Sequence, residues 1–213
     1  GEPVEWRVLD KKDGEILLLS EYGLDAQPFD TSGKSRVDWK DSTIRKWLND
    51  DFYNSAFSEK EKENIVESKS EGFEEYNTSM NLTGGGKPYA YLEREIEDKV
   101  FLLSNTELCA YFSEDPYPGC YSDPYAHKEL LCYPTAYAKQ QLETRYQTET
   151  CGWWLCNHVY EDDSVELVSA YGQGSGTSRE NIKANTKSIA VRPAMWVTWQ
   201  SDMEMVEANQ QVE

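Results

Sequence analysis

The sequence predicts an α+β fold: one domain over residues 1–213, built from a small antiparallel sheet, short flanking helices and long loops. Three observations indicate this. Two short apolar stretches joined by a turn signal open the chain, and short helical patterns with capping residues follow. After residue 150, apolar stretches of strand length return. No internal repeat, linker or change of composition divides the 213 residues, so a single domain is expected.

The opening stretches, Val4–Leu9 and Glu15–Ser20, are separated by a short polar segment that ends in Asp13-Gly14. Asp-Gly is a preferred pair for a tight hairpin turn, so an antiparallel hairpin is expected. A polar loop with proline and glycine follows, over Gly23–Lys40.

A helix is expected from about Ser42, which with Asp41 is a candidate N-cap, because an apolar stripe follows at helical spacing: Ile44, Trp47 and Leu48. Trp47 is expected at the buried centre of this stripe. Asn49-Asp50-Asp51 is expected to interrupt the helix. A capping box of Ser58 and Glu61 then predicts a short helix to about Ile65.

The later elements follow from the same signals. Residues 68–97 and 113–133 read as long loops. Asp98–Leu103 is expected to be a buried strand, and Ser104 with Glu107 to form a second capping box. A short helix is expected over Thr135–Leu142. Three further strands are expected: Cys151–Leu155, Val165–Ala170 and Ile189–Val197.

Composition excludes several classes of function. The chain has 21 Lys and Arg against 39 Asp and Glu, a formal net charge of −18. Binding to nucleic acid or to an anionic membrane depends on clustered basic residues, so neither partner is expected. The longest apolar run, Ile16–Leu19, is far shorter than the roughly 18 residues of a membrane span, so no membrane insertion is expected. Seven Trp, fourteen Tyr and six Phe can supply a core despite a mean hydropathy of −0.75.

No catalytic or metal-binding constellation emerges from the motifs. Five cysteines occur, an odd number and without the paired spacing of structural zinc sites: Cys109, Cys120, Cys132, Cys151 and Cys156. The glycine-rich Gly172–Thr177 segment fits neither a phosphate-binding loop nor a nucleophile turn. His127 and His158 lie in no hydrolase motif. The acidic cluster 161–163 with Glu166 lacks the EF-hand spacing, and a solvated turn is favoured over calcium. We therefore expect no catalytic residues, no metal and no cofactor.

The segment Cys151–Cys156 is the most informative one. Side chains alternate faces along a strand, so Trp153 and Trp154 are expected on opposite sides. Trp153 is predicted to pack in the core. Trp154 is either an outward stacking platform for a ligand or a side chain covered by a long loop. The candidate ligand-binding residues are this tryptophan and polar or aromatic residues that follow it: Trp154, Asn157, His158 and Tyr171.

Arg192 lies in a strand among apolar neighbours, which include Ala194 and Trp196. A buried guanidinium needs partners, so we expect an ion pair or a fork of hydrogen bonds to carbonyls, made with an acidic residue from the first half of the chain. The alternative is a side chain whose stem packs on Trp196 while its head reaches water. The predicted role of Arg192 is structural, like that of Trp47, Trp153 and Trp196.

Several blocks in order resemble one bacterial family. They are WRVL at 6–9, LLLSEYGLDAQPF at 17–29, TIRKWLNDDFYNSAFSEKEK at 43–62, DKVFLLSNTEL at 98–108, PTAYA at 134–138, WWL at 153–155 and the closing VRPAMW. The chain resembles the domain of unknown function 6273, found in secreted or surface proteins of anaerobic gut bacteria. That resemblance implies an extracytoplasmic location. It also implies a C-type-lectin-like, twisted sheet, related to formylglycine-generating enzymes, in which Val191–Val197 pairs with Val4–Leu9 and long loops form the ligand surface.

The expected function is a non-enzymatic ligand-binding or adhesion module that presents loops 68–97, 113–133 and 156–188 to a glycan or protein. One alternative is an enzyme of the formylglycine-generating type that uses a cysteine pair, for which Cys151 and Cys156 are the nearest candidates. Their opposed faces argue against them. Another alternative is a purely structural domain of a larger surface protein.

Overall fold

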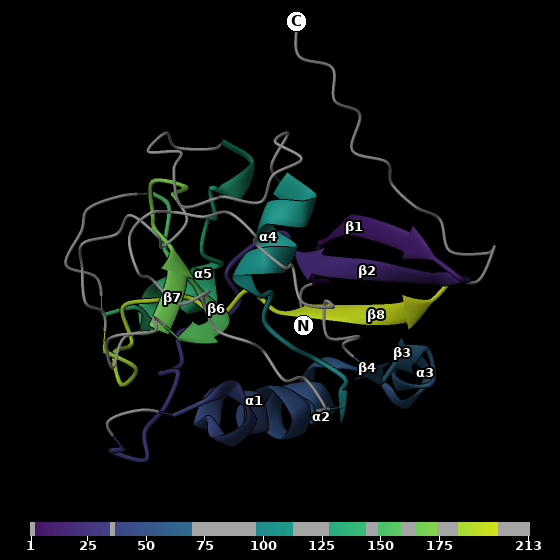
Figure 1. Cartoon of the computed structure of the whole chain (residues 1–213), viewed down its shortest axis with the longest axis horizontal. Helices are drawn as coiled ribbons and strands as arrows, with labels where there is room; N and C mark the ends of the chain where they lie inside the picture. The colour runs from purple at the N-terminus through teal and green to yellow at the C-terminus, as the bar shows by residue number, and fades with distance from the viewer. Residues whose placement is uncertain are drawn as a thin grey trace, which may run out of the picture.

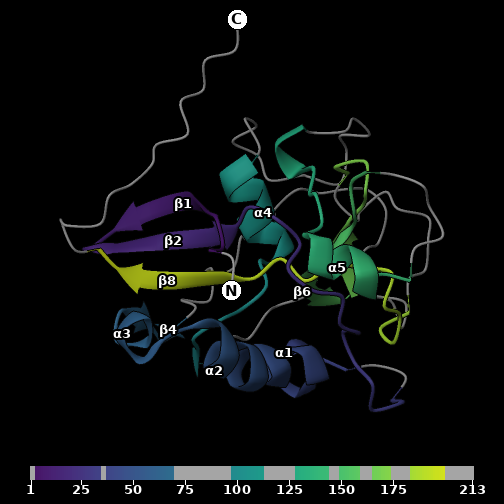
Figure 2. The same ribbon diagram turned by 180° about the vertical axis from the view of Figure 1, so that it is seen from behind.

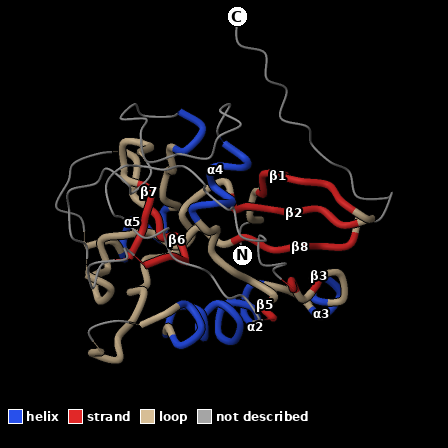
Figure 3. The backbone as a smooth tube through the Cα atoms, viewed as in Figure 1, coloured by secondary structure: helices blue, strands red, loops and turns tan. Residues whose placement is uncertain are grey.

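The structure, a computed structural model, describes residues 3–34, 37–69, 97–112, 128–143, 149–158, 165–173 and 183–199. It confirms the predicted α+β class, with small antiparallel sheets, short helices and long connections (Figures 1 and 3). The strands are β1 Trp6–Lys12, β2 Glu15–Ser20, β3 Ile65–Val66, β4 Ser68–Lys69, β5 Glu97–Asp98, β6 Trp153–His158, β7 Val165–Val168 and β8 Ala194–Thr198. The helices are α1 Thr43–Trp47, α2 Tyr53–Ala56, α3 Glu59–Lys62, α4 Asn105–Phe112 and α5 Ala136–Gln141, with single turns η1 Trp39–Asp41, η2 Leu48–Phe52 and η3 Lys128–Leu130. No helix in these ranges has the length and apolar character that crossing a membrane requires.

The main sheet has four antiparallel strands in the order β1-β2-β8-β3. The predicted hairpin is present, and its turn uses positive φ angles of 53° at Asp13 and 82° at Gly14. The expectation that the closing strand pairs with β1 is wrong, because β8 pairs with β2 and β3. The physical reason is composition. Strand β2 is largely buried, whereas β1 carries charged side chains and is suited to an edge.

The helical segment that follows begins as predicted. The Ser42 hydroxyl accepts a hydrogen bond from the Arg45 N–H at 3.3 Å and so caps α1. The chain does not break at residues 49–51, where one turn of π-helix (η2) joins α1 to α2. Ile44 and Leu48 are fully buried, whereas Trp47 is only half-buried and packs on Phe52, with ring centroids 5.4 Å apart. The predicted stripe is therefore correct, but its centre is Leu48 and not Trp47.

This correction gives a prediction about stability. Replacing Leu48 with alanine should lower the free energy of unfolding by about 2–5 kcal/mol, because it leaves a cavity in the core. The larger truncation Trp47→Ala should cost less, since part of that ring already faces water. Urea unfolding of both variants measures the difference. A greater loss for Trp47→Ala would restore the tryptophan to the centre of the stripe.

Both predicted capping boxes are confirmed. The Ser58 N–H and hydroxyl each donate to Glu61 at 2.7 Å. Ser104 makes the same two contacts with Glu107, also at 2.7 Å, at the start of α4. The first of these helices ends at Lys62 and not at about Ile65, because Ile65 begins β3 and pairs with Val197.

A second hairpin, β6–β7, lies with α5 on the side of the molecule opposite the β1–β2 turn (Figures 1 and 2). An extended segment connects this hairpin to the main sheet. Phe101 exchanges two main-chain hydrogen bonds with Ala194, at 2.9 and 2.8 Å, and Leu103 accepts one from Cys156 at 3.1 Å. The predicted strand over Asp98–Leu103 is thus shorter than expected, although residues 100–103 are all buried.

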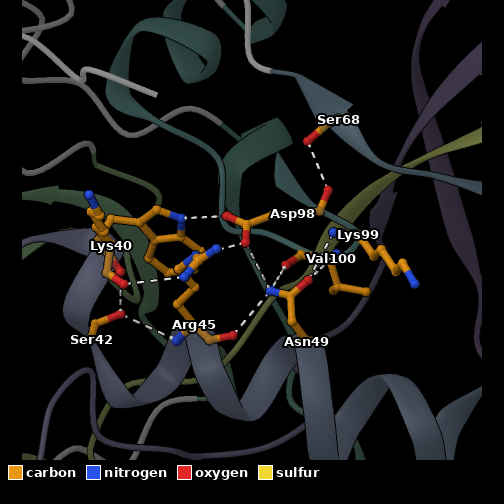
Figure 4. Close-up of polar contacts among 9 residues, drawn as sticks. Lys40, Ser42, Arg45, Asn49, Ser68, Asp98, Lys99 and Val100 are labelled. Carbon is orange, nitrogen blue, oxygen red and sulfur yellow. Dashed lines mark hydrogen bonds and ion pairs between the residues drawn. The ribbon is translucent and has the colours of Figure 1, made fainter. Parts of the chain in front are cut away.

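The buried carboxylate of Asp98 joins this segment to the first helices (Figure 4). It accepts hydrogen bonds from the Trp39 indole at 2.8 Å, from Arg45 Nε at 2.7 Å and from Asn49 Nδ2 at 3.3 Å. The side-chain oxygen Oδ1 of Asn49 in turn accepts the N–H of Lys99 at 2.8 Å. One acidic side chain therefore holds three residues of the helical segment in a single arrangement.

Candidate functional site

Trp154 is not an exposed platform for a ligand. Its side chain is 0% exposed, and its indole N–H donates to the main-chain carbonyl of Gln27 at 3.0 Å. The ring meets Phe29 edge-on, with centroids 6.0 Å apart. Of the two interpretations of this residue, burial is correct and the stacking platform is wrong. The loop that follows β2 covers the ring, since Gln27 and Phe29 both belong to it. A buried indole N–H needs a hydrogen-bond partner, and the Gln27 carbonyl provides one.

Two of the other candidate ligand-binding residues, Asn157 and Tyr171, differ in exposure. Asn157 is buried beside Cys156, and the backbone of His158 ends β6. Tyr171 is well exposed, in the turn after β7. Much of the three expected ligand loops falls outside the described residues, namely 70–96, 113–127, 159–164 and 174–182. His127, the acidic cluster 161–163 and most of the glycine-rich segment also lie outside the described residues.

The described residues instead present exposed aromatic rings around one loop contact. Gly23 and Pro134 form a parallel bridge, in which the Gly23 N–H donates to the Tyr133 carbonyl at 3.0 Å and the Thr135 N–H donates to the Gly23 carbonyl at 2.9 Å. Tyr22 and Tyr133 are the residues immediately before the bridged pair. In parallel pairing, equivalent neighbours point to the same side. Their side chains are 36% and 48% exposed.

A third exposed ring lies close by in sequence. Helix α5 begins directly after the bridge, where the Thr135 hydroxyl accepts the Ala138 N–H at 3.1 Å. This cap places Tyr137 in the first turn, with 58% of its side chain exposed. We call Tyr22, Tyr133 and Tyr137 the tyrosine surface. Three exposed aromatic side chains within a few residues of one contact between loops are a candidate ligand surface.

A half-exposed ion pair lies beside Tyr22. Arg7 Nε donates to Glu21 Oε2 at 2.9 Å, and a second guanidinium nitrogen donates to Oε1 at 2.5 Å. The remaining terminal nitrogen of Arg7 donates to the main-chain carbonyl of Glu129 at 3.1 Å. A two-point pair of this kind fixes the orientation of both groups. It therefore holds the Glu21 carboxylate and the Arg7 guanidinium in fixed positions, one residue from Tyr22 in sequence.

The buried Arg192 side chain donates hydrogen bonds to the main chain just before Tyr22. Its side chain is 0% exposed, its Nε donates to the Ser20 carbonyl at 2.8 Å, and one terminal nitrogen donates to the Glu21 carbonyl at 3.4 Å. The predicted carbonyl fork with an acidic residue from the first half is confirmed, since Glu21 contributes its main chain to Arg192 and its carboxylate to Arg7. Burial lowers the pKa of Arg192. These contacts fix the backbone immediately before Tyr22.

Of the two tryptophans near this arginine, Trp153 is buried in the core as predicted, whereas Trp196 is only partly buried. The guanidinium lies over the buried Trp153 ring, 4.9 Å from its centroid, and the Trp153 indole donates to the Leu130 carbonyl at 3.1 Å. Trp196 is only partly buried and packs at the edge of the core. The alternative of an arginine whose head reaches water is therefore wrong.

Sequence reasoning missed the tyrosine surface, although a signal was present. Tyr22 precedes a glycine and Tyr133 precedes a proline, residue types that mark turns at the surface. An exposed aromatic residue next to such a turn is more informative than one inside a strand. The sequence did not indicate that these two turns pair with each other, through Gly23 and Pro134.

Three comparisons relate the chain to known families, curated proteins and solved structures. The model of a family described as a domain of unknown function (DUF6273) matches residues 13–199. No curated protein matches the chain, and no solved structure matches it.

Proposed function

The chain belongs to the DUF6273 family, and since that description assigns no activity, we propose a function from the tyrosine surface: a non-enzymatic, extracytoplasmic binding or adhesion module that takes a glycan. The observation that carries the proposal is the exposure of Tyr22, Tyr133 and Tyr137 around a single loop contact. A protein ligand is the second candidate, because tyrosine is also enriched at protein interfaces.

The chemistry of the surface suits a sugar. A tyrosine ring offers an apolar face for the C–H side of a pyranose, and its hydroxyl remains available for hydrogen bonds. The Arg7–Glu21 pair, one residue from Tyr22 in sequence, offers a donor and an acceptor in fixed positions. Rigid aromatic rings lose little conformational entropy on binding, since each has only two rotatable side-chain bonds.

A formylglycine-generating type of enzyme, the alternative from the sequence, requires two thiols that a substrate can reach. Cys151 and Cys156 do not serve, because Cys151 contacts Cys132 and Cys156 contacts Asn157. All three of these cysteines are buried. The burial of the Cys132–Cys151 pair favours the binding module over this enzyme. The other alternative, a purely structural domain of a larger surface protein, is compatible with the same fold. Only a binding experiment distinguishes it from a binding module.

The proposal predicts the outcome of a binding experiment. Purified protein should bind one class of glycan on an array and should retain gut mucin in a pull-down. The double variant Tyr133→Ala/Tyr137→Ala should weaken that binding about tenfold or more, as expected for central aromatic contacts. Tyr171→Ala changes an exposed tyrosine outside the tyrosine surface that is itself a candidate from the sequence; it should bind like the wild type, and weaker binding would place the site at Tyr171.

Deglycosylated mucin separates the two ligand classes. Loss of binding on removal of the sugars supports a glycan, and full retention supports a protein ligand. Absence of binding to both the array and mucin would count against a binding module of this kind. Binding that is unchanged in the double variant would place the site elsewhere on the chain.

A further inference from the structure

Two buried cysteines, far apart in sequence, come together beneath the tyrosine surface. The Cys151 N–H donates to the Cys132 carbonyl at 2.8 Å, and the Cys151 thiol lies 3.5 Å from the same oxygen. Both cysteines are buried free thiols in the structure, and each is close enough to shift the pKa of the other. A methyl group placed on Gly23 would lie 3.2 Å from the Cys151 sulfur and 3.6 Å from the Cys132 sulfur. Both sulfurs therefore converge on one small space.

We propose that Cys132 and Cys151 form an intramolecular disulfide. Backbones joined by a hydrogen bond of this type lie about 5 Å apart. This is within the separation of about 4.4–6.8 Å between the Cα atoms of a disulfide. The glycine at position 23 leaves the space that the bridge occupies. Cys156 is not an alternative partner for Cys151, since its side chain lies on the opposite face of the extended segment.

The charges around the pair assign a role to each sulfur. The neighbouring Cys151 thiol and then the Arg192 guanidinium lower the pKa of Cys132. The neighbouring Cys132 thiol and burial raise the pKa of Cys151. Within the described part of the chain, one terminal nitrogen of Arg192 has no hydrogen-bond partner. Cys132 is therefore the sulfur that ionises first, beside a cation that favours the thiolate.

The bond forms by exchange with a disulfide donor such as glutathione disulfide. The Cys132 thiolate attacks one sulfur of the donor, the donor S–S bond breaks, and the released thiolate takes up a proton. Cys151 then loses its proton and attacks the Cys132 sulfur, which displaces the second donor thiol. Two protein thiols are oxidised and one donor disulfide is reduced to two thiols. Because both sulfurs are buried, the exchange takes place during folding or local opening.

The bridge has a consequence for the neighbouring surface. Cys132 immediately precedes Tyr133, and Cys151 lies just before β6. A covalent bond between them attaches the segment that carries Tyr133 to the hairpin that contains Trp153. The inference does not depend on the proposed ligand, and it suits an oxidising compartment of the kind that an extracytoplasmic location provides.

Peptide mapping of the Cys156→Ser variant tests the proposal. The reduced, unfolded protein is refolded in a glutathione redox buffer, alkylated in denaturant and digested with trypsin. Cys132 then lies in the peptide 129–139 and Cys151 in the peptide 146–179, where Cys156→Ser leaves it the single cysteine. We expect these two peptides to be linked. The additional change Cys151→Ser is the control and should abolish the link.

The stability of the oxidised protein gives a second measurement. The bridge restricts the unfolded chain, so the oxidised Cys156→Ser variant should unfold at a higher urea concentration than the same protein reduced with dithiothreitol. Two outcomes would overturn the proposal. One is full alkylation of both peptides, or a link from either of them to the peptide 100–128. The other is an oxidised form no more stable than the reduced one, which would show that the folded chain does not accommodate the bridge.

Discussion

Replacing Asp98 with alanine is expected to lower the free energy of unfolding by about 3–5 kcal/mol, the usual cost of removing one partner from a buried ion pair. The carboxylate is buried and accepts hydrogen bonds from three side chains, those of Trp39, Arg45 and Asn49. Alanine leaves the buried indole N–H of Trp39 unpaired and takes the charge partner from Arg45.

Urea unfolding of the purified variant measures this loss. Asp51→Ala is the matched control, because Asp51 is an exposed aspartate of the same helical segment, and it should change stability by no more than about 0.5 kcal/mol. Asp98→Asn keeps the shape of the side chain but removes its charge, so its loss of stability should lie between those of Asp98→Ala and Asp51→Ala. Equal stability of Asp98→Ala and the control would mean that the network in Figure 4 does not hold the helices.

Trp154→Ala should cost about 3–5 kcal/mol, as for other large aromatic residues in a core. The ring is fully buried against Phe29, and its N–H satisfies the Gln27 carbonyl, so truncation leaves both a cavity and an unpaired acceptor. Tyr171→Ala removes an exposed ring of comparable chemistry and should change stability by about 0.5 kcal/mol or less.

Thermal or urea unfolding of the two variants separates the two interpretations of this tryptophan. If Trp154→Ala lowers the free energy of unfolding by less than about 1 kcal/mol and also reduces ligand binding, Trp154 is an exposed binding residue and not a core residue. The expected result is the reverse, in which stability falls steeply.

Local signals predicted the local structure well. The Asp13-Gly14 turn, the Ser42 cap and the capping box at Ser58 each depend on residues a few positions apart, and each is present. Periodicity also found the stripe of α1. It could not tell that Leu48 and not Trp47 lies at its centre, because burial there depends on which element packs against the helix.

The remaining features depend on contacts between distant parts of the chain. Strand β8 pairs with β2 and not with β1, because β2 is the more apolar and more deeply buried of the two strands. How deeply a strand is buried is a property of the assembled sheet. The tyrosine surface exists because Gly23 meets Pro134, and the cysteine pair because Cys132 meets Cys151. Arg192 is the exception. Although Arg192 lies just before β8 and not within a strand, its apolar neighbours in sequence were enough to predict its carbonyl partners, but not its contact with Trp153.

The position of β8 has a consequence for the order of folding. This strand comes from residues 194–198, yet it lies between β2 and β3 in the sheet, and the residues just before it pair with Gly152 and Asp25. During synthesis on the ribosome, the β1–β2 hairpin emerges long before the strand that completes it. The edge of β2 that pairs with β8 therefore stays unpaired until β8 has been synthesised. A sheet completed by contacts so distant in sequence forms slowly. We infer that the native core assembles only after residue 198 has left the ribosome, and that chains stalled before this point expose β2 to chaperones.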